Sequence, residues 1–194
     1  PSEDLANLLK KGSAGIFPTD TVPALAARPA FASQLWKIKN RSLDKPLILM
    51  GASLEDLFKY VSSKALNDAS KIAEEYWPGP LTMVLPAAGS LVDELNQGGK
   101  TIGIRLPNCL MARELMAKSG PLATTSANLS GKNPIFDVEG LMKCFPEIPL
   151  LGPLNWPNAS GIASTVIGWQ GVGEWLLLRK GDVIPNGCKN FLGK

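Results

Sequence analysis

The chain has 194 residues, of which 45% are hydrophobic and 19% charged, and it carries a formal net charge of +3 with no histidine. The length predicts one domain over residues 1–194, and the missing histidine excludes the Ser-His-Asp triad, the Cys-His pair and the usual zinc-hydrolase sites. No apolar run reaches the ~18 residues of a membrane span, and the acidic start lacks a signal-peptide pattern, so we expect a cytoplasmic protein without a membrane partner.

The first half of the chain alternates predicted helices with short predicted strands. Apolar stripes and helix-end residues indicate helices over residues 2–12, 30–39, 54–61 and 65–76. Buried strands are predicted over residues 14–17 and 47–50, and the stretch 22–27 is apolar. Residues 77–80 contain two prolines and a glycine, and they predict a rigid turn.

The second half continues the same alternation. Strands are predicted over residues 81–85, 101–106, 121–125, 162–167 and 175–179, and helices over 110–118 and 137–145. The Gly-rich polar connection that ends at Lys100 is predicted to be a mobile loop. Helices that alternate with strands throughout a chain indicate an α/β fold.

Two hydroxyls and a carboxylate, Thr19-Asp20-Thr21, directly follow the first predicted strand. Ligands of open α/β sheets bind at such strand ends. The alternative is a turn in which Asp20 or Thr21 hydrogen-bonds its own backbone. The local pattern alone slightly favours the turn.

Three cations, Lys39, Arg41 and Lys45, lie close together at the end of a predicted helix. Arginine offers a planar fork to two phosphate oxygens, whereas lysine offers a movable point charge. The alternative is a solvated basic helix end, stabilised by the helix dipole. Lys45 favours an anion pocket, because a third cation in a Pro-containing loop is not needed for capping.

Residues 124–131 are rich in hydroxyl and amide groups and follow a predicted buried strand. They are suited to reading the polar edges of a nucleotide, although neither a Walker loop nor a G-x-G-x-x-G motif is present. The alternative is a Ser- or Asn-capped helix start, which we regard as the weaker interpretation. Arg105 shares one face of its strand with Thr101, and an arginine on a half-buried strand usually meets an anion.

Eight motifs spread over almost the whole chain occur in the order found in the YrdC family, the threonylcarbamoyl-AMP synthases, which this sequence therefore resembles. The motifs are Phe17-Pro-Thr-Asp-Thr-Val22, Lys39-Asn-Arg41, Lys45-Pro-Leu-Ile48, Trp77-Pro-Gly-Pro-Leu-Thr82, Ile102-Gly-Ile-Arg-Leu-Pro107, Thr125-Ser-Ala-Asn-Leu-Ser-Gly131, Ser164-Thr-Val166 and Leu178-Arg-Lys-Gly181. Each motif is weak alone, but eight in order are specific.

The resemblance implies a twisted mixed β-sheet with flanking helices and a basic concave cavity, in the short single-domain form of the family. It implies a nucleotidyltransferase that makes threonylcarbamoyl-AMP and pyrophosphate from L-threonine, bicarbonate or CO2, and ATP. A tRNA-modifying threonylcarbamoyl transferase would be the partner that uses the product. Mg2+ would arrive with ATP as its counter-ion, with no metal ligand from protein side chains.

The resemblance also implies roles for individual residues. The catalytic elements would be Lys39, Arg41, Ser126 and Asn128. The contacts to ATP would be Arg41, Lys45, Thr101, Ser126, Pro134 and Arg179. The contacts to threonine would be Thr21, Arg105, Thr124 and Ser164.

The chain departs from the family at three places near the amino-acid end of the expected pocket. Pro23 and Ala24 replace a usual Tyr-Gly pair, the following stretch before Lys39 is about three residues shorter than is typical, and Met50 stands where some members have histidine. These departures leave open a paralogue, such as the YciO branch, that uses another acyl partner. A double-stranded RNA- or tRNA-binding module and a carbamoyl-transfer role, like that of the YrdC-like module in hydrogenase maturation proteins, are further alternatives.

Overall fold

A computed structural model describes residues 2–190. Within them, nine strands form one sheet in the order β1-β2-β6-β3-β5-β4-β7-β8-β9. The strands are β1 (Gly15–Phe17), β2 (Ala24–Ala27), β3 (Ile48–Met50), β4 (Leu81–Pro86), β5 (Thr101–Arg105), β6 (Leu122–Ser126), β7 (Thr165–Gly171), β8 (Glu174–Arg179) and β9 (Lys189–Asn190). The helices are α1 (Ser2–Lys10), η1 (Pro29–Phe31), α2 (Ser33–Lys39), α3 (Leu54–Phe58), α4 (Ser63–Tyr76), α5 (Leu91–Leu95), α6 (Leu110–Ser119) and α7 (Val138–Cys144).

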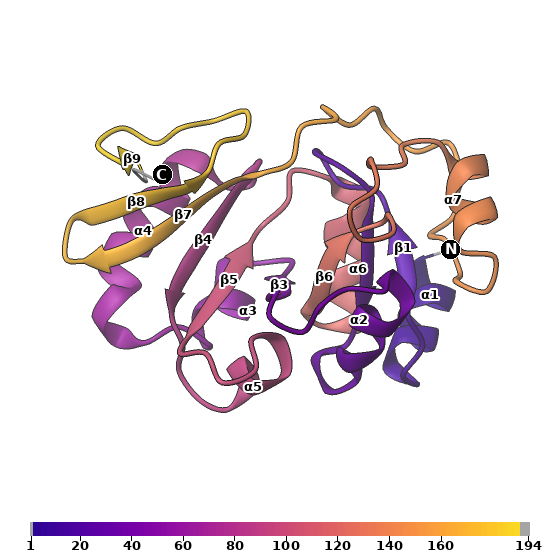
Figure 1. The fold of residues 1–194 in the computed structure, drawn as a ribbon, viewed down its shortest axis with the longest axis horizontal. Coiled ribbons are helices and arrows are strands. Elements are labelled where there is room, and N and C mark those ends of the chain that lie inside the picture. The colour runs from indigo at the N-terminus through magenta and orange to yellow at the C-terminus, as the bar shows by residue number, and fades with distance from the viewer. Residues whose placement is uncertain (1, 191–194) are drawn as a thin grey trace.

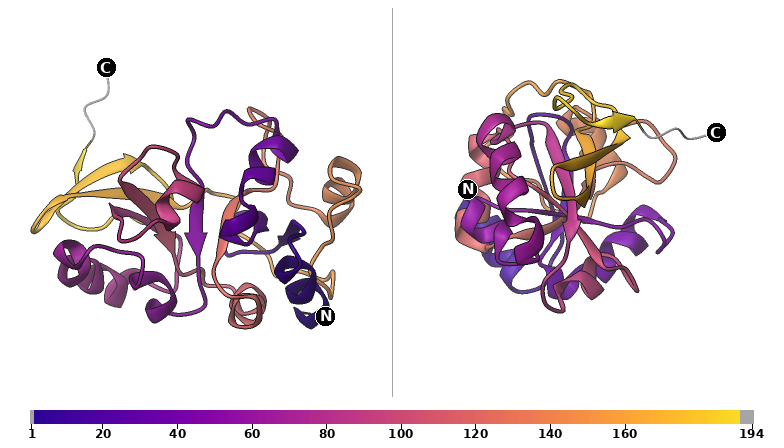
Figure 2. Two further views of the ribbon diagram at one scale, coloured as in Figure 1. Left: turned by 90° about the horizontal axis from the view of Figure 1, so that it is seen from below. Right: turned by 90° about the vertical axis from the view of Figure 1, so that its left-hand side faces the viewer.

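The sheet is mixed, as the family resemblance implies. β3–β5, β4–β7 and β8–β9 are parallel pairs, and the other neighbours are antiparallel. The β7–β8 hairpin lies at one end of the molecule, and β1 with α1 at the other (Figure 1). Two further views show helices on both sides of the sheet (Figure 2). The α/β fold with flanking helices is therefore confirmed.

Four neighbouring strands, β1, β2, β6 and β3, contribute successive residues alternately to two separate hydrophobic clusters. Ile16, Leu25, Leu49 and Ala123 belong to a cluster shared with α2, α3 and α4. The intervening side chains belong to a cluster shared with α1 and α6; they are Phe17, Ala24, Ala26, Met50 and Leu122. Successive side chains of a strand point to opposite faces, so these strands are covered on both sides.

Some element predictions need correction. The connection before Lys100, predicted to be a mobile loop, contains α5, whose Leu95 is fully buried and packs in the larger cluster. The apolar stretch 22–27 contains β2, the strand predicted over residues 162–167 begins only at Thr165, and β9 was not predicted. The two ends of the expected domain, Pro1 and residues 191–194, lie outside the described residues. None of the described helices is both long and apolar enough to cross a membrane.

Asp68 of α4 hydrogen-bonds to the β7–β8 hairpin and so holds the hairpin against this helix. Its Oδ2 accepts hydrogen bonds from Trp169 Nε1 at 2.9 Å and from the Gly173 amide at 2.8 Å. These two bonds lower the pKa of Asp68 below its usual value. We expect Asp68→Ala to reduce the free energy of unfolding by about 2 kcal/mol, because it removes two hydrogen bonds to a carboxylate, one of them from a partly buried indole N–H. Urea unfolding measures this loss. The control is Glu74→Ala, on the exposed face of the same helix, which should change the free energy of unfolding little.

Candidate active site

A cavity of about 170 Å3 lies over the middle of the sheet. Its wall combines apolar side chains with arginines and hydroxyls, and consists of Val22, Pro23, Ala24, Arg41, Pro46, Ile48, Met50, Arg105, Thr124, Thr125, Ser126, Pro134, Ala163, Ser164 and Arg179. Residues that are direct cross-strand neighbours share one face of a sheet. The register pairs Ile48 with Thr124, Met50 with Arg105, and Ala24 with Ser126. One face of β2, β6, β3 and β5 therefore forms the floor.

Lys39, in the last turn of α2, is almost completely buried, with 1% of its surface exposed. Its Nζ donates to Ser126 Oγ at 3.2 Å, to Asn128 Oδ1 at 3.0 Å and to the Ser126 carbonyl. Burial, reinforced by the charge of Arg41, lowers the pKa of Lys39 from 10.5 to about 8. All three ammonium hydrogens have acceptors within the protein, so Lys39 supports the Ser126 wall from behind.

The segment after β6 is a loop, and no helix begins there. Asn128 Nδ2 donates to the Leu129 carbonyl at 3.1 Å and to the Lys132 carbonyl at 2.5 Å. Ser126 Oγ donates to Asn128 Oδ1 at 2.6 Å. The capped-helix interpretation of this segment is therefore wrong. Asn128 instead folds the loop back, so that Ser126 faces the cavity.

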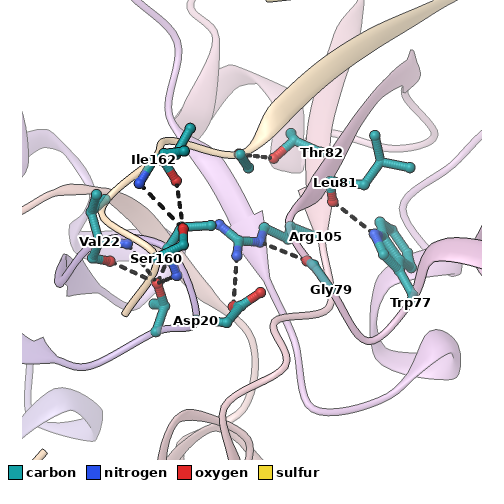
Figure 3. A network of polar contacts seen from close by, with 12 residues as sticks. Asp20, Val22, Trp77, Gly79, Leu81, Thr82, Arg105, Ser160 and Ile162 are labelled. Carbon is teal, nitrogen blue, oxygen red and sulfur yellow. Dashed lines mark hydrogen bonds and ion pairs between the residues drawn. The ribbon is translucent and has the colours of Figure 1, made fainter. Parts of the chain in front are cut away.

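Arg105, at the end of β5, is held by three acceptors from two distant segments. Its guanidinium donates to Asp20 Oδ1 at 2.6 Å, Thr21 Oγ1 at 2.8 Å and the Gly79 carbonyl at 3.1 Å. Figure 3 shows it between Asp20 and Gly79. Burial lowers the pKa of Arg105 and the Asp20 charge raises it. An arginine keeps its proton under such shifts, so the cavity retains this positive charge.

The turn before β2 is made by Thr19, and not by the side chains of Asp20 or Thr21. Thr19 Oγ1 accepts from the amides of Thr21 and Val22 at 3.1 and 3.2 Å, and it donates to the Val22 carbonyl at 2.7 Å. Asp20 is thereby free to pair with Arg105. Its Oδ2 is buried and has no hydrogen-bond partner within residues 2–190.

Two further arginines face the cavity without forming an ion pair with any carboxylate of the described chain. Arg41 donates to the carbonyls of Lys45 and Pro46 at 3.3 and 3.1 Å. Arg179 donates from Nε and Nη2 to the Ser164 carbonyl at 3.1 and 2.8 Å. Burial lowers the pKa of both guanidinium groups. Arg41 is half-buried, Arg179 is exposed, and cations without an ion-paired carboxylate are suited to a multiply charged anion.

The structure brings most of the residues predicted for ligand binding to one cavity. Those on its wall are Arg41, Arg105, Thr124, Ser126, Pro134, Ser164 and Arg179. Lys39, Asn128 and Thr21 lie behind the wall and hydrogen-bond to residues on it. Lys45 and Thr101 are exposed and lie outside the wall, although the Lys45 carbonyl holds Arg41.

Sequence reasoning assigned no role to buried Thr82 beside the cavity, and it considered Asp20 only as part of a strand-end ligand segment or of a turn. Both lie within motifs that the sequence displays, but their partners are 85 and 82 positions away. Only the folded sheet brings them together. Among the described residues, no three of the types His, Cys, Asp and Glu gather where they could hold a metal ion.

Comparisons with known proteins agree with this geometry. The model of the Sua5/YciO/YrdC family, described as "Telomere recombination", matches residues 7–181. The threonylcarbamoyl-AMP synthase of Blochmanniella floridana is 36% identical over 173 residues, 84% of this chain and 91% of that protein. The rat enzyme of the same name is 29% identical over 195 residues, 96% of this chain and 69% of that protein. The crystal structure of P. abyssi Sua5 complexed with L-threonine superposes with a TM-score of 0.85 at 30% identity, over 93% of this chain and 54% of that chain.

Proposed function

Because the chain belongs to the Sua5/YciO/YrdC family, we propose that it is a threonylcarbamoyl-AMP synthase, a nucleotidyltransferase that uses ATP, L-threonine and bicarbonate or CO2. The observation that carries this proposal is the arginine-lined cavity, in which Arg41 and Arg179 lack carboxylate partners among the described residues. Relatives named threonylcarbamoyl-AMP synthase support the same activity.

The triphosphate of ATP binds at the end of the cavity that contains Arg41, Ser126 and Arg179. Two guanidinium groups supply forked donors for phosphate oxygens, and the positive charge of Lys39 behind Ser126 adds to the field. Mg2+ enters bound to the triphosphate and neutralises part of its charge. Pro134, together with the predicted contacts Lys45 and Thr101, lies toward the rest of the nucleotide.

L-threonine binds around Arg105. A guanidinium has five N–H donors, and the protein uses three of them on Asp20, Thr21 and Gly79. Two N–H donors are left for the carboxylate of the amino acid. Thr124 and Ser164 offer hydroxyls on the same wall. The P. abyssi relative solved with L-threonine supports this assignment of the substrate.

In the reaction, the threonine nitrogen first takes up CO2 with loss of a proton, or bicarbonate with loss of water, to form a carbamate. A carbamate oxygen then bonds to the α-phosphorus of ATP, the bond from that phosphorus to the bridging oxygen breaks, and pyrophosphate leaves with the electron pair. Preorganised cations stabilise the charge that develops on the transferring phosphoryl group. The product serves a tRNA-modifying transferase that moves the threonylcarbamoyl group to an adenosine of tRNA.

The departures from the family pattern at Pro23, Ala24 and Met50 bear on which amino acid is the substrate. Pro23, Ala24 and Met50 all lie on the cavity wall, and Met50 is the cross-strand neighbour of Arg105. They do not alter Arg41, Ser126 or Arg179. A different acyl partner is therefore the second candidate, because Met50 lies beside Arg105 at the amino-acid end of the cavity.

Pyrophosphate release from ATP tests the proposal directly. We expect release only when both L-threonine and bicarbonate are present. L-serine and L-valine in place of threonine, at equal concentration, measure how far Pro23, Ala24 and Met50 have changed the acyl partner. Release driven better by another amino acid would favour the second candidate. ATP binding without release in any mixture would argue against a synthase.

A further inference from the structure

A buried threonine outside the cavity wall, Thr82 of β4, contacts the side chain of Ser164. The two Oγ atoms are 2.9 Å apart, and Thr82 is completely buried. Figure 3 shows the Thr82 hydroxyl with its dashed contact. Ser164 Oγ also accepts from Arg179 Nη2 at 3.2 Å. Thr82, Ser164 and Arg179 therefore form a chain of hydrogen bonds that joins β4 to β8.

The direction of the bond between the two hydroxyls follows from counting hydrogens. Each hydroxyl has one hydrogen and two lone pairs. Thr82 Oγ1 has no partner other than Ser164 within residues 2–190. If Ser164 donated to it, the Thr82 hydrogen would be buried without an acceptor, which is costly. Thr82 is therefore the donor, and Ser164 Oγ accepts from both Thr82 and Arg179.

Thr124, another hydroxyl assigned to threonine, already donates its hydrogen within the protein. Its Oγ1 donates to the Ile48 carbonyl at 2.9 Å. Thr21, the third, lies behind the wall, and its Oγ1 accepts from Arg105. Thr124 consequently offers a ligand only lone pairs, whereas Ser164 keeps its hydrogen.

We propose that Thr82 is a positioning residue that directs the Ser164 hydroxyl hydrogen into the cavity, where Ser164 donates to an oxygen of the amino-acid substrate. The proposal rests on the proposed function for the identity of that substrate. Ser164 then recognises an oxygen acceptor, while the lone pairs of Thr124 accept a hydroxyl hydrogen. An amino acid with a side-chain hydroxyl supplies both partners.

Steady-state kinetics on Thr82→Val and Thr82→Ser test the proposal. Valine keeps the shape of threonine but removes the hydroxyl, so we expect the KM for L-threonine to rise about tenfold, the loss of roughly one hydrogen bond. The dissociation constant of a nonhydrolysable ATP analogue should stay within about twofold, and Thr82→Ser should restore the wild-type KM. The matched control is Ser119→Ala, which removes another buried hydroxyl bond, from Ser119 Oγ to the Gly120 carbonyl; it should leave both constants unchanged.

An unchanged threonine KM in Thr82→Val, a failure of Thr82→Ser to restore it, or equal weakening of both ligands would overturn the proposal. Neutron diffraction from crystals of the ligand-free wild type decides the bond direction without reference to activity. We expect the deuteron on Thr82 Oγ1, pointing at Ser164 Oγ; a deuteron on Ser164 pointing at Thr82 would overturn the inference. A lack of threonine-dependent pyrophosphate release by the wild-type protein would instead contradict the proposed function.

Discussion

Replacing Lys39 by methionine is expected to slow threonine-dependent pyrophosphate release by about 10²- to 10³-fold, the usual cost of losing one preorganised electrostatic group. Methionine fills a similar volume but supplies no hydrogen for Ser126 or Asn128. Three oxygens accept hydrogen bonds from Lys39 Nζ in the wild type, and the substitution leaves them without that donor. The Ser126 wall and the positive field behind the phosphates are therefore lost together.

Lys37→Met is the matched control, because it removes the same charge two residues earlier on an exposed face of α2. It should retain nearly full activity. Thermal unfolding of both variants checks that each is folded. Equal, small losses in the two variants would show that Lys39 contributes only general positive charge.

The lowered pKa of Lys39 gives the same prediction a second readout in the unmodified protein. A base whose pKa falls from 10.5 to about 8 gives up its proton at a lower pH, so the ammonium charge is present below pH 8 and is lost above it. The affinity for a nonhydrolysable ATP analogue should accordingly decline between pH 7.5 and about 9 in the wild type. In Lys39→Met the affinity should be lower and flat over that range. A wild-type profile as flat as that of the variant would contradict the role of Lys39.

Local sequence patterns were sufficient for most of the elements because those elements carry their own signals. Helix α4, for example, has a regular apolar stripe and ends where Trp77-Pro78 begins. The short helix α5 has no such signal. Five residues between glycines and polar side chains look like a loop, and only the packing of Leu95 into the core makes them a helix.

The cavity was predictable as a set of motifs but not as a set of contacts. Sequence indicated that Lys39 and Ser126 belong to one site, yet it suggested that Lys39 reaches the ligand directly. The fold buries Lys39 and turns its ammonium group to the loop after β6. Likewise, nothing in the local pattern of β4 distinguishes Thr82 from an ordinary strand threonine. Its partner, Ser164, is set by the parallel pairing of β4 with β7, a long-range feature.

Replacing Arg105 by lysine should raise the KM for L-threonine by about 10²-fold while the affinity for the ATP analogue changes by less than about twofold. Lysine keeps the charge but lacks the planar fork. It cannot hold Asp20, Thr21 and Gly79 and still present two N–H groups to a carboxylate. The conservative change is chosen because complete removal would leave Asp20 buried without its partner, at a cost of about 3–5 kcal/mol that could unfold the protein.

Comparing the effects of Arg105→Lys on threonine binding and on ATP binding distinguishes recognition of the amino acid from general support of the fold. A structural role would weaken ATP and threonine together and lower the unfolding temperature, whereas a carboxylate clamp weakens threonine alone. Arg28→Lys, at an exposed position, is the matched control for the chemistry of the substitution. Isothermal titration with L-threonine provides the direct measurement. Wild-type affinity in Arg105→Lys would show that the carboxylate binds elsewhere, and Arg179, bonded to Ser164 on the same wall, would be the next cation to test.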